Sequence, residues 1–102
     1  MTNDDVKRRA ALVDVVQEYG EPAWPENFVD EIPNLTNIRP YLLIERTYNG
    51  KDVAYSMHYS VKEVLRVAAA EIYEGCYYPE ALVDLDRGTT QLLGITVDIM
   101  ED

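Results

Sequence analysis

The chain of 102 residues has little cysteine, histidine or basic residue content. It holds one cysteine, Cys76, and one histidine, His58, so it cannot form an internal disulfide and offers no cysteine–histidine cluster for zinc. It has no apolar run long enough to cross a membrane and no secretion signal at its start. These absences predict a cytoplasmic protein.

The sequence also lacks the motifs that usually identify an enzyme. There is no phosphate-binding loop, no GxGxxG and no calcium loop. His58 is expected on a solvent-facing strand surface without an orienting carboxylate. Cys76 follows the end of a predicted helix, where the helix dipole disfavours a thiolate. Asp84 and Asp86 project from one side of a strand, but no ligand loop surrounds them. We therefore expect no catalytic residue, no metal site and no cofactor.

Acidic residues dominate the charge of the chain. There are 19 acids and 9 bases, which gives a net charge of −10. Two tracts, residues 10–38 and 67–86, contain acids and no base. A field of this sign repels nucleic acids and anionic membranes and accelerates encounters with basic protein surfaces. The distribution therefore favours a protein partner with a basic surface.

The first forty residues predict a helix followed by an ordered loop. Capping residues at 2–3, acids in the first turn and apolar residues at three- and four-residue steps indicate a helix over 3–19, ended by Gly20. Four of the five prolines fall within 21–40 and exclude a long regular element there. Because this segment is rich in apolar side chains, we interpret it as a loop packed across the core, with one or two helical turns at 27–32.

The segment 41–59 predicts a β-hairpin. Asn49-Gly50 is the preferred two-residue turn of such hairpins. Closing it pairs Arg46 with Val53, Ile44 with Tyr55 and Leu42 with Met57. One face is then apolar and faces the core. The other face is predicted to be mostly solvated; it carries Leu43, Glu45, Thr47, Asp52, Ala54, Ser56 and His58.

The second half predicts a helix and another hairpin. Ser60 and Glu63 form a capping box before an amphipathic helix that Gly75 ends. Alternating residues at 81–86 and 92–100 predict two strands about the turn 86–89, with Leu82 and Leu92 outside. The expected fold is a single α+β domain, 1–102, of order α-loop-β-β-α-β-β, with two helices packed on one face of a four-stranded antiparallel sheet.

Tyrosine is the second unusual feature, with eight residues in the chain. Tyrosine is enriched in protein interfaces because it offers a large contact area at low entropic cost. Tyr77 and Tyr78 stand among acids, which suits a partner rich in lysine and arginine. The predicted partner-binding residues are Asp14, Glu18, Glu21, Glu71, Glu74, Tyr77, Tyr78, Glu80, Asp84 and Asp86.

Three functions fit these features. The first is a non-enzymatic inhibitor that covers the nucleic-acid-binding surface of another protein, such as a nuclease or CRISPR effector; small acidic phage proteins of the anti-CRISPR and anti-restriction type share this size and charge. The second is an immunity or antitoxin protein that neutralises a basic nuclease toxin. The third is a housekeeping or scaffold domain from a proteome that is acidic throughout. A homodimer is also conceivable, through pairing of a last strand that ends at Ile99-Met100.

Overall fold

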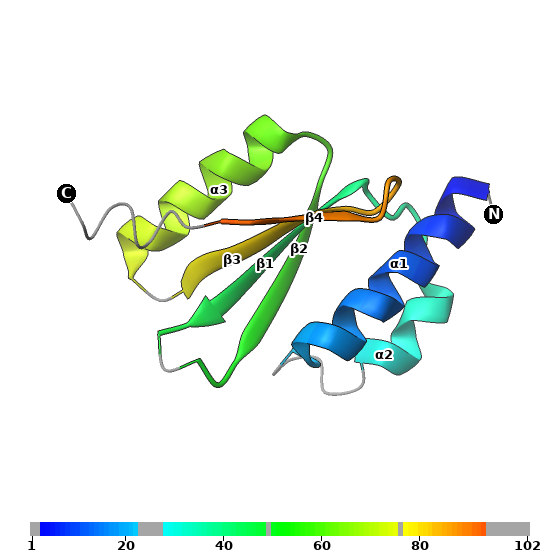
Figure 1. Ribbon diagram of the computed structural model, residues 1–102, viewed down its shortest axis with the longest axis horizontal. Coiled ribbons are helices and arrows are strands. Elements are labelled where there is room, and N and C mark those ends of the chain that lie inside the picture. Colours follow the sequence, from blue (N-terminus) through cyan, green and yellow to red (C-terminus); the bar gives the residue numbers. More distant parts are fainter. Residues whose placement is uncertain (1–2, 23–27, 49, 76, 94–102) are drawn as a thin grey trace.

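A four-stranded antiparallel sheet forms the middle layer of the molecule (Figure 1). The computed structural model describes residues 3–22, 28–48, 50–75 and 77–93. In these ranges the strands are β1 (Tyr41–Thr47), β2 (Val53–His58), β3 (Tyr77–Asp84) and β4 (Thr89–Leu92), in the spatial order β2-β1-β3-β4. The helices are α1 (Asn3–Tyr19), α2 (Phe28–Glu31) and α3 (Val61–Glu74), and a 3-10 turn, η1 (Ile32–Asn34), follows α2. The α+β class, the antiparallel sheet and the predicted order of the elements are confirmed.

The helices lie on both faces of the sheet, so the prediction that both would pack on one face is wrong. Figure 1 shows α3 on one side of the strands and α1 with α2 on the other. Leu12 and Val16 of α1 pack with Leu42 and Ile44. A second cluster has formed on the opposite face, where α3 covers the sheet; it consists of Leu43, Val64, Ala68 and Leu82.

The second cluster overturns the prediction of a solvated hairpin face. Leu43 is fully buried, and Glu45 and His58 are only 6% and 7% exposed. Leu82, also predicted to lie outside, is 6% exposed. The alternation along the strands was assigned correctly, but α3 covers the face that carries these residues. Apolar and polar side chains alternate along a strand whichever face a helix later covers, so the pattern did not reveal the second layer.

The first hairpin has the predicted register. Arg46 pairs with Val53, Ile44 with Tyr55 and Leu42 with Met57. The N–H of Gly50 donates to Thr47 O over 2.8 Å, and Gly50 has a φ of 74°, a conformation that glycine adopts without strain. Asn49, the other half of the predicted turn, lies outside the described residues.

The second hairpin begins earlier than predicted. β3 begins at Tyr77 instead of residue 81, and β4 ends at Leu92, where the last strand was expected to begin. Ala81 of β3 pairs with Leu92 of β4. Between Ile44 and Glu45 of β1, the register of pairing with the long strand β3 shifts. Residues 94–102, which include the predicted dimer strand ending at Ile99-Met100, lie outside the described residues.

Because both faces of β1 are buried, we expect Leu42 and Leu43 to contribute equally to the free energy of unfolding. Leu42 and Leu43 are both fully buried but belong to different clusters. We expect Leu43→Ala to lower the free energy of unfolding by about 3 kcal/mol, as Leu42→Ala should. Urea unfolding followed by circular dichroism measures both.

Leu92→Ala is the matched control, because Leu92 is 74% exposed and its loss should cost less than about 0.5 kcal/mol. A Leu43→Ala variant as stable as Leu92→Ala would contradict the placement of α3 over this face.

Candidate partner-binding surface

The acids of the first base-free tract are exposed on the layer formed by α1 and α2. We call this set the acidic layer; its described members are Asp14, Glu18, Glu21, Asp30 and Glu31, all exposed. Asp14 and Glu18 are one helical turn apart on α1, opposite the face that buries Leu12 and Val16. No ion pair among the described residues engages Asp14 or Glu18. Their charge is available to a partner.

Arg8, in the N-terminal half of α1, is turned toward the sheet. Arg8 donates from Nε and Nη2 to the two carboxylate oxygens of Asp86, over 2.7 and 2.9 Å, and from Nη1 to Ile38 O over 2.7 Å. These hydrogen bonds hold the pKa of Asp86 below its usual value. Asp86, one of the predicted partner-binding residues, therefore anchors α1 to the turn after β3.

A second arginine fixes the other end of α1 in the same way. Arg46 Nε donates to both carboxylate oxygens of Glu80, over 3.0 and 2.8 Å, and Arg46 Nη2 donates to Tyr19 O over 3.2 Å. The hydroxyl of Tyr55 donates to Gly20 O, just beyond the helix. Glu80, like Asp86, is thus used inside the chain.

The remaining predicted residues of the second acidic tract are spread over different parts of the structure. Asp84 Oδ1 accepts from the backbone N–H of Asp86 and of Arg87, over 3.0 and 3.1 Å, so it shapes the turn between β3 and β4. Glu71 lies partly buried on α3. Glu74 ends that helix, and its side chain is outside the described set.

The two adjacent tyrosines do not form one aromatic patch. Tyr77 and Tyr78 are consecutive in β3, so their side chains point to opposite faces of the sheet. Tyr78 packs against Tyr48, with ring centroids 5.6 Å apart. Tyr77 and Tyr78 were predicted to act together because they are adjacent in sequence. In a strand, adjacent residues lie on opposite faces, so the two side chains are separated.

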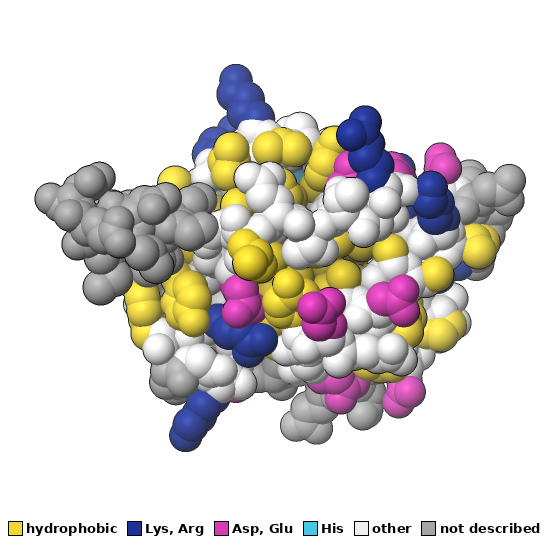
Figure 2. Space-filling model, viewed as in Figure 1, with side chains coloured by type: hydrophobic (Ala, Val, Ile, Leu, Met, Phe, Trp, Pro, Cys, Tyr) yellow, Lys and Arg dark blue, Asp and Glu magenta, His cyan; other side chains and the backbone are white. Residues whose placement is uncertain are grey.

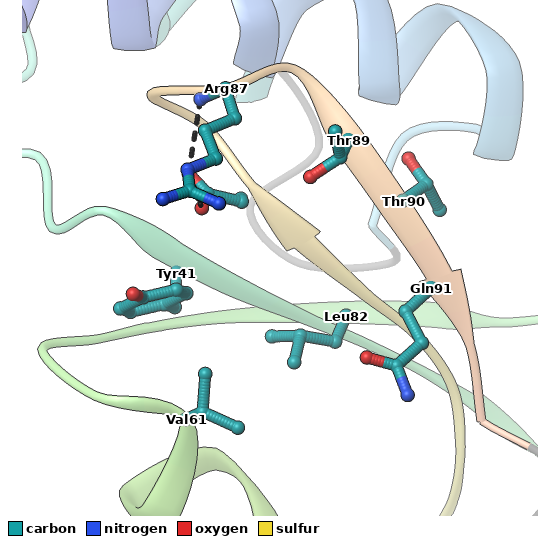
Figure 3. A pocket seen from close by; sticks show the side chains of 8 residues that line it. Tyr41, Val61, Leu82, Arg87, Thr89, Thr90 and Gln91 are labelled. Carbon is teal, nitrogen blue, oxygen red and sulfur yellow. Dashed lines mark hydrogen bonds and ion pairs between the residues drawn. The ribbon is translucent and has the colours of Figure 1, made fainter.

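Two hollows flank the exposed strand β4. The larger, of about 310 Å³, lies on the α3 face between Tyr41, Val61 and Leu82 on one side and β4 on the other (Figure 3). The smaller, of about 140 Å³, lies toward α1 and is lined by Asp14, Glu18 and Thr90 among others. All four residues of β4 are exposed. Part of the acidic layer therefore borders the edge strand directly.

One face of the molecule shows the resulting surface. Figure 2 shows Asp and Glu side chains dispersed over this face of the molecule with apolar side chains between them, and Figure 1 places α1 and α2 at the right of the same view. Mixed acidic and apolar surface is suited to a basic protein partner, because apolar contacts add affinity while charges orient the approach.

Sequence reasoning missed a polar seam beneath α3. Here Glu45 is buried, and its Oε2 has no hydrogen-bond partner among the described residues. Burial together with the charge of Glu71 raises the pKa of Glu45 from 4.5 to about 7. His58 is buried as well and is held by Glu63, which corrects the expectation of a surface histidine without a carboxylate. The five-residue separation of His58 from Glu63 across a strand end and a helix start was the signal that could have revealed the contact.

Comparison of the chain with protein-family models, with curated proteins and with solved structures found no match. Among the described residues, no group of histidine, cysteine and acidic side chains is arranged to hold a metal ion. In the same part of the chain, no helix has the length and apolar character needed to cross a membrane.

The buried carboxyl of Glu45 predicts a stability that depends on pH. The folded state keeps its proton up to about pH 7, whereas the unfolded chain loses it near pH 4.5. Its contribution to stability is complete below pH 4.5 and is lost as the pH rises through 7. We expect Glu45→Gln to be more stable than the wild type by about 3 kcal/mol at pH 8 and nearly equal at pH 4.5.

Chemical denaturation at several pH values measures this difference. The exposed Glu31 provides the control, since Glu31→Gln should give a difference that is small and independent of pH. An equally flat profile for Glu45→Gln would show that the carboxyl is solvated in the folded protein.

Proposed function

We propose that this chain is a protein-binding module whose acidic layer covers the basic, nucleic-acid-binding surface of another protein in the cytoplasm. The proposed partner is a nuclease or a CRISPR effector, which makes the chain an inhibitor of the anti-CRISPR or anti-restriction type. The observation that carries the proposal is that acids of α1 and α2 are exposed, whereas Arg8 of α1 and Arg46 of β1 bind carboxylates within the chain.

The contrast between the two acidic tracts supports this assignment. Asp14 and Glu18 are exposed and project away from the core, whereas Glu80 and Asp86 are paired with Arg46 and Arg8. Carboxylates spaced along a helix can replace phosphates as partners of lysine and arginine, because both present anionic oxygens to the same donors. An ion pair already formed inside the chain presents little charge to a partner.

Strand β4, an edge of the sheet within the described part of the chain, extends the proposed surface. Its four exposed residues and the hollow lined by Asp14, Glu18 and Thr90 adjoin α1. An extended segment of the partner can add to such an edge through main-chain hydrogen bonds. Binding then combines charge from the helix with apolar contact at Leu92, which is 74% exposed.

The first test is affinity capture from the source cells at low and at high salt. We expect the captured proteins to be nucleic-acid-binding proteins that are released by high salt or by added DNA or RNA, because screening and competition both act on charge. Capture that is unaffected by salt and by nucleic acid would contradict the proposal.

A charge-neutralised variant locates the surface. The quadruple variant Asp14→Asn, Glu18→Gln, Asp30→Asn and Glu31→Gln should weaken binding to the captured partner by about 2 kcal/mol, roughly thirtyfold, since exposed ion pairs contribute about 0.5 kcal/mol each. Isothermal titration calorimetry at about 50 mM salt measures this loss of affinity.

Two single variants serve as matched controls. Asp52 is exposed in the β1–β2 turn, away from the acidic layer, so Asp52→Asn should bind like the wild type. Asp86→Asn removes the partner of Arg8 and should lower the melting temperature while leaving affinity nearly unchanged. If Asp52→Asn weakened binding as much as the quadruple variant does, the acidic layer would not be the binding surface.

A further inference from the structure

The polar seam beneath α3 contains a hydrogen-bonded chain of a hydroxyl, an imidazole and a carboxylate. Ser56 Oγ lies 2.8 Å from His58 Nε2, and His58 Nδ1 lies 2.8 Å from Glu63 Oε1. A carboxylate only accepts hydrogen bonds, so Nδ1 carries the proton that Glu63 accepts. In the neutral imidazole Nε2 is then the acceptor, and the hydroxyl of Ser56 donates to it.

Local structure brings these three side chains together. Ser56 and His58 are two residues apart in β2 and therefore share the face that α3 covers. Ser60 caps α3 by accepting from the N–H of Glu63, which places Glu63 in the first turn of that helix. The side chain of Glu63 then reaches back to His58 at the end of β2.

The three hydrogen-bonded side chains differ in how deeply they are buried. The side chain of His58 is 9% exposed and that of Glu63 is 29% exposed, and Ser56 is partly exposed. Within the described residues β2 is an edge strand, so the hydroxyl of Ser56 lies at the rim of the sheet. A buried base beside an accessible hydroxyl is the arrangement that activates a serine.

We propose that Ser56 is a nucleophile, with His58 as its general base, in acyl transfer from small esters. Ser56 Oγ bonds to the ester carbonyl carbon while its proton passes to His58 Nε2. Collapse of the tetrahedral intermediate breaks the bond to the leaving alcohol oxygen, which takes that proton. Water then repeats the two steps at the acyl-serine and releases the acid.

Glu63 acts as a positioning residue. Its carboxylate fixes the tautomer and orientation of His58 and stabilises the imidazolium that forms. Arg39 brings a positive charge to the same edge, where its Nη1 donates over 3.2 Å to O of Met57, the residue between Ser56 and His58.

The charges around Ser56 determine the class of substrate. Glu63 contacts His58, and Glu45, near Glu71, lies on the same face of the sheet, opposite Ala54 and two residues along from Ser56. The carboxylate of Glu63 repels anionic substrates, and Glu45 adds to this repulsion above about pH 7, where it loses its proton. The substrates are therefore neutral or cationic esters, and this activity is independent of partner binding by the acidic layer.

The sequence-based expectation of no catalysis depended on a surface histidine without a carboxylate. The contact between His58 and Glu63 removes that premise. Catalysis further requires that an ester can bind close to the three groups, and a reactive probe tests this requirement.

The experiment is labelling of the full chain with a neutral fluorophosphonate, followed by peptide mass spectrometry. In labelling, Ser56 Oγ bonds to phosphorus, fluoride leaves, and the proton passes to His58 Nε2. Ser60 is the only other serine of the chain and is exposed, so it is an internal control. We expect label on Ser56 and none on Ser60.

Variants then test the role of each partner. His58→Gln should slow labelling of Ser56 at least about a hundredfold, as loss of a general base does. Glu63→Gln keeps an acceptor oxygen but removes the charge; it should lower kcat for p-nitrophenyl acetate about tenfold with KM unchanged. Thr36→Ala changes an exposed hydroxyl outside this set of contacts and should hydrolyse this ester like the wild type, whereas Ser56→Ala should not exceed the rate in buffer.

The proposal is overturned if Ser56 stays unlabelled in the folded wild type, or if Ser56 and Ser60 are labelled equally. It is also overturned if Ser56→Ala keeps the wild-type rate of ester hydrolysis. Should His58→Gln fail to fold, as judged by circular dichroism, the comparison of Ser56 with Ser60 and the Glu63→Gln kinetics still decide the matter.

Discussion

Burial of strand β1 on both of its faces is the constraint on which the rest of the structure depends. Leu42 and Ile44 pack against α1, and Leu43 packs against α3, all three with no exposed surface. A strand covered on both sides needs a helix layer on each, so the sheet becomes the central layer of three. Among the described elements, this arrangement leaves the two outer strands, β2 and β4, as the edges of the sheet.

The two proposed sites occupy opposite sides of this central layer. The acidic layer lies on α1 and α2, and the side chains of Ser56, His58 and Glu63 meet on the α3 side. The ion pairs of Arg8 and Arg46 hold α1 on the sheet and at the same time neutralise Asp86 and Glu80. Fold stabilisation and surface charge are thus divided between different acids, since Asp86 and Glu80 are paired within the chain whereas Asp14 and Glu18 are exposed.

Several parts of the fold were predictable because local rules determine them. The helix 3–19, the register of the first hairpin and the capped start of α3 follow from periodicity, turn residues and caps that act within a few positions. The boundaries of β3 and β4 were not predictable in this way. The alternation of 92–100 was as regular as that of 81–86, and pairing with β1 extends β3 back to Tyr77.

The sequence by itself determined the acidic charge, its two base-free tracts and the α+β order of the elements. Only the tertiary structure decided that α3 covers the second face of the sheet, which buries Glu45 and places His58 against Glu63. It also decided which acids stay exposed. Asp14 and Asp86 each lie in a base-free acidic tract, but only Asp86 contacts an arginine, which is 78 residues away in the sequence. Charge is a property of composition, whereas desolvation and pairing depend on contacts between distant segments.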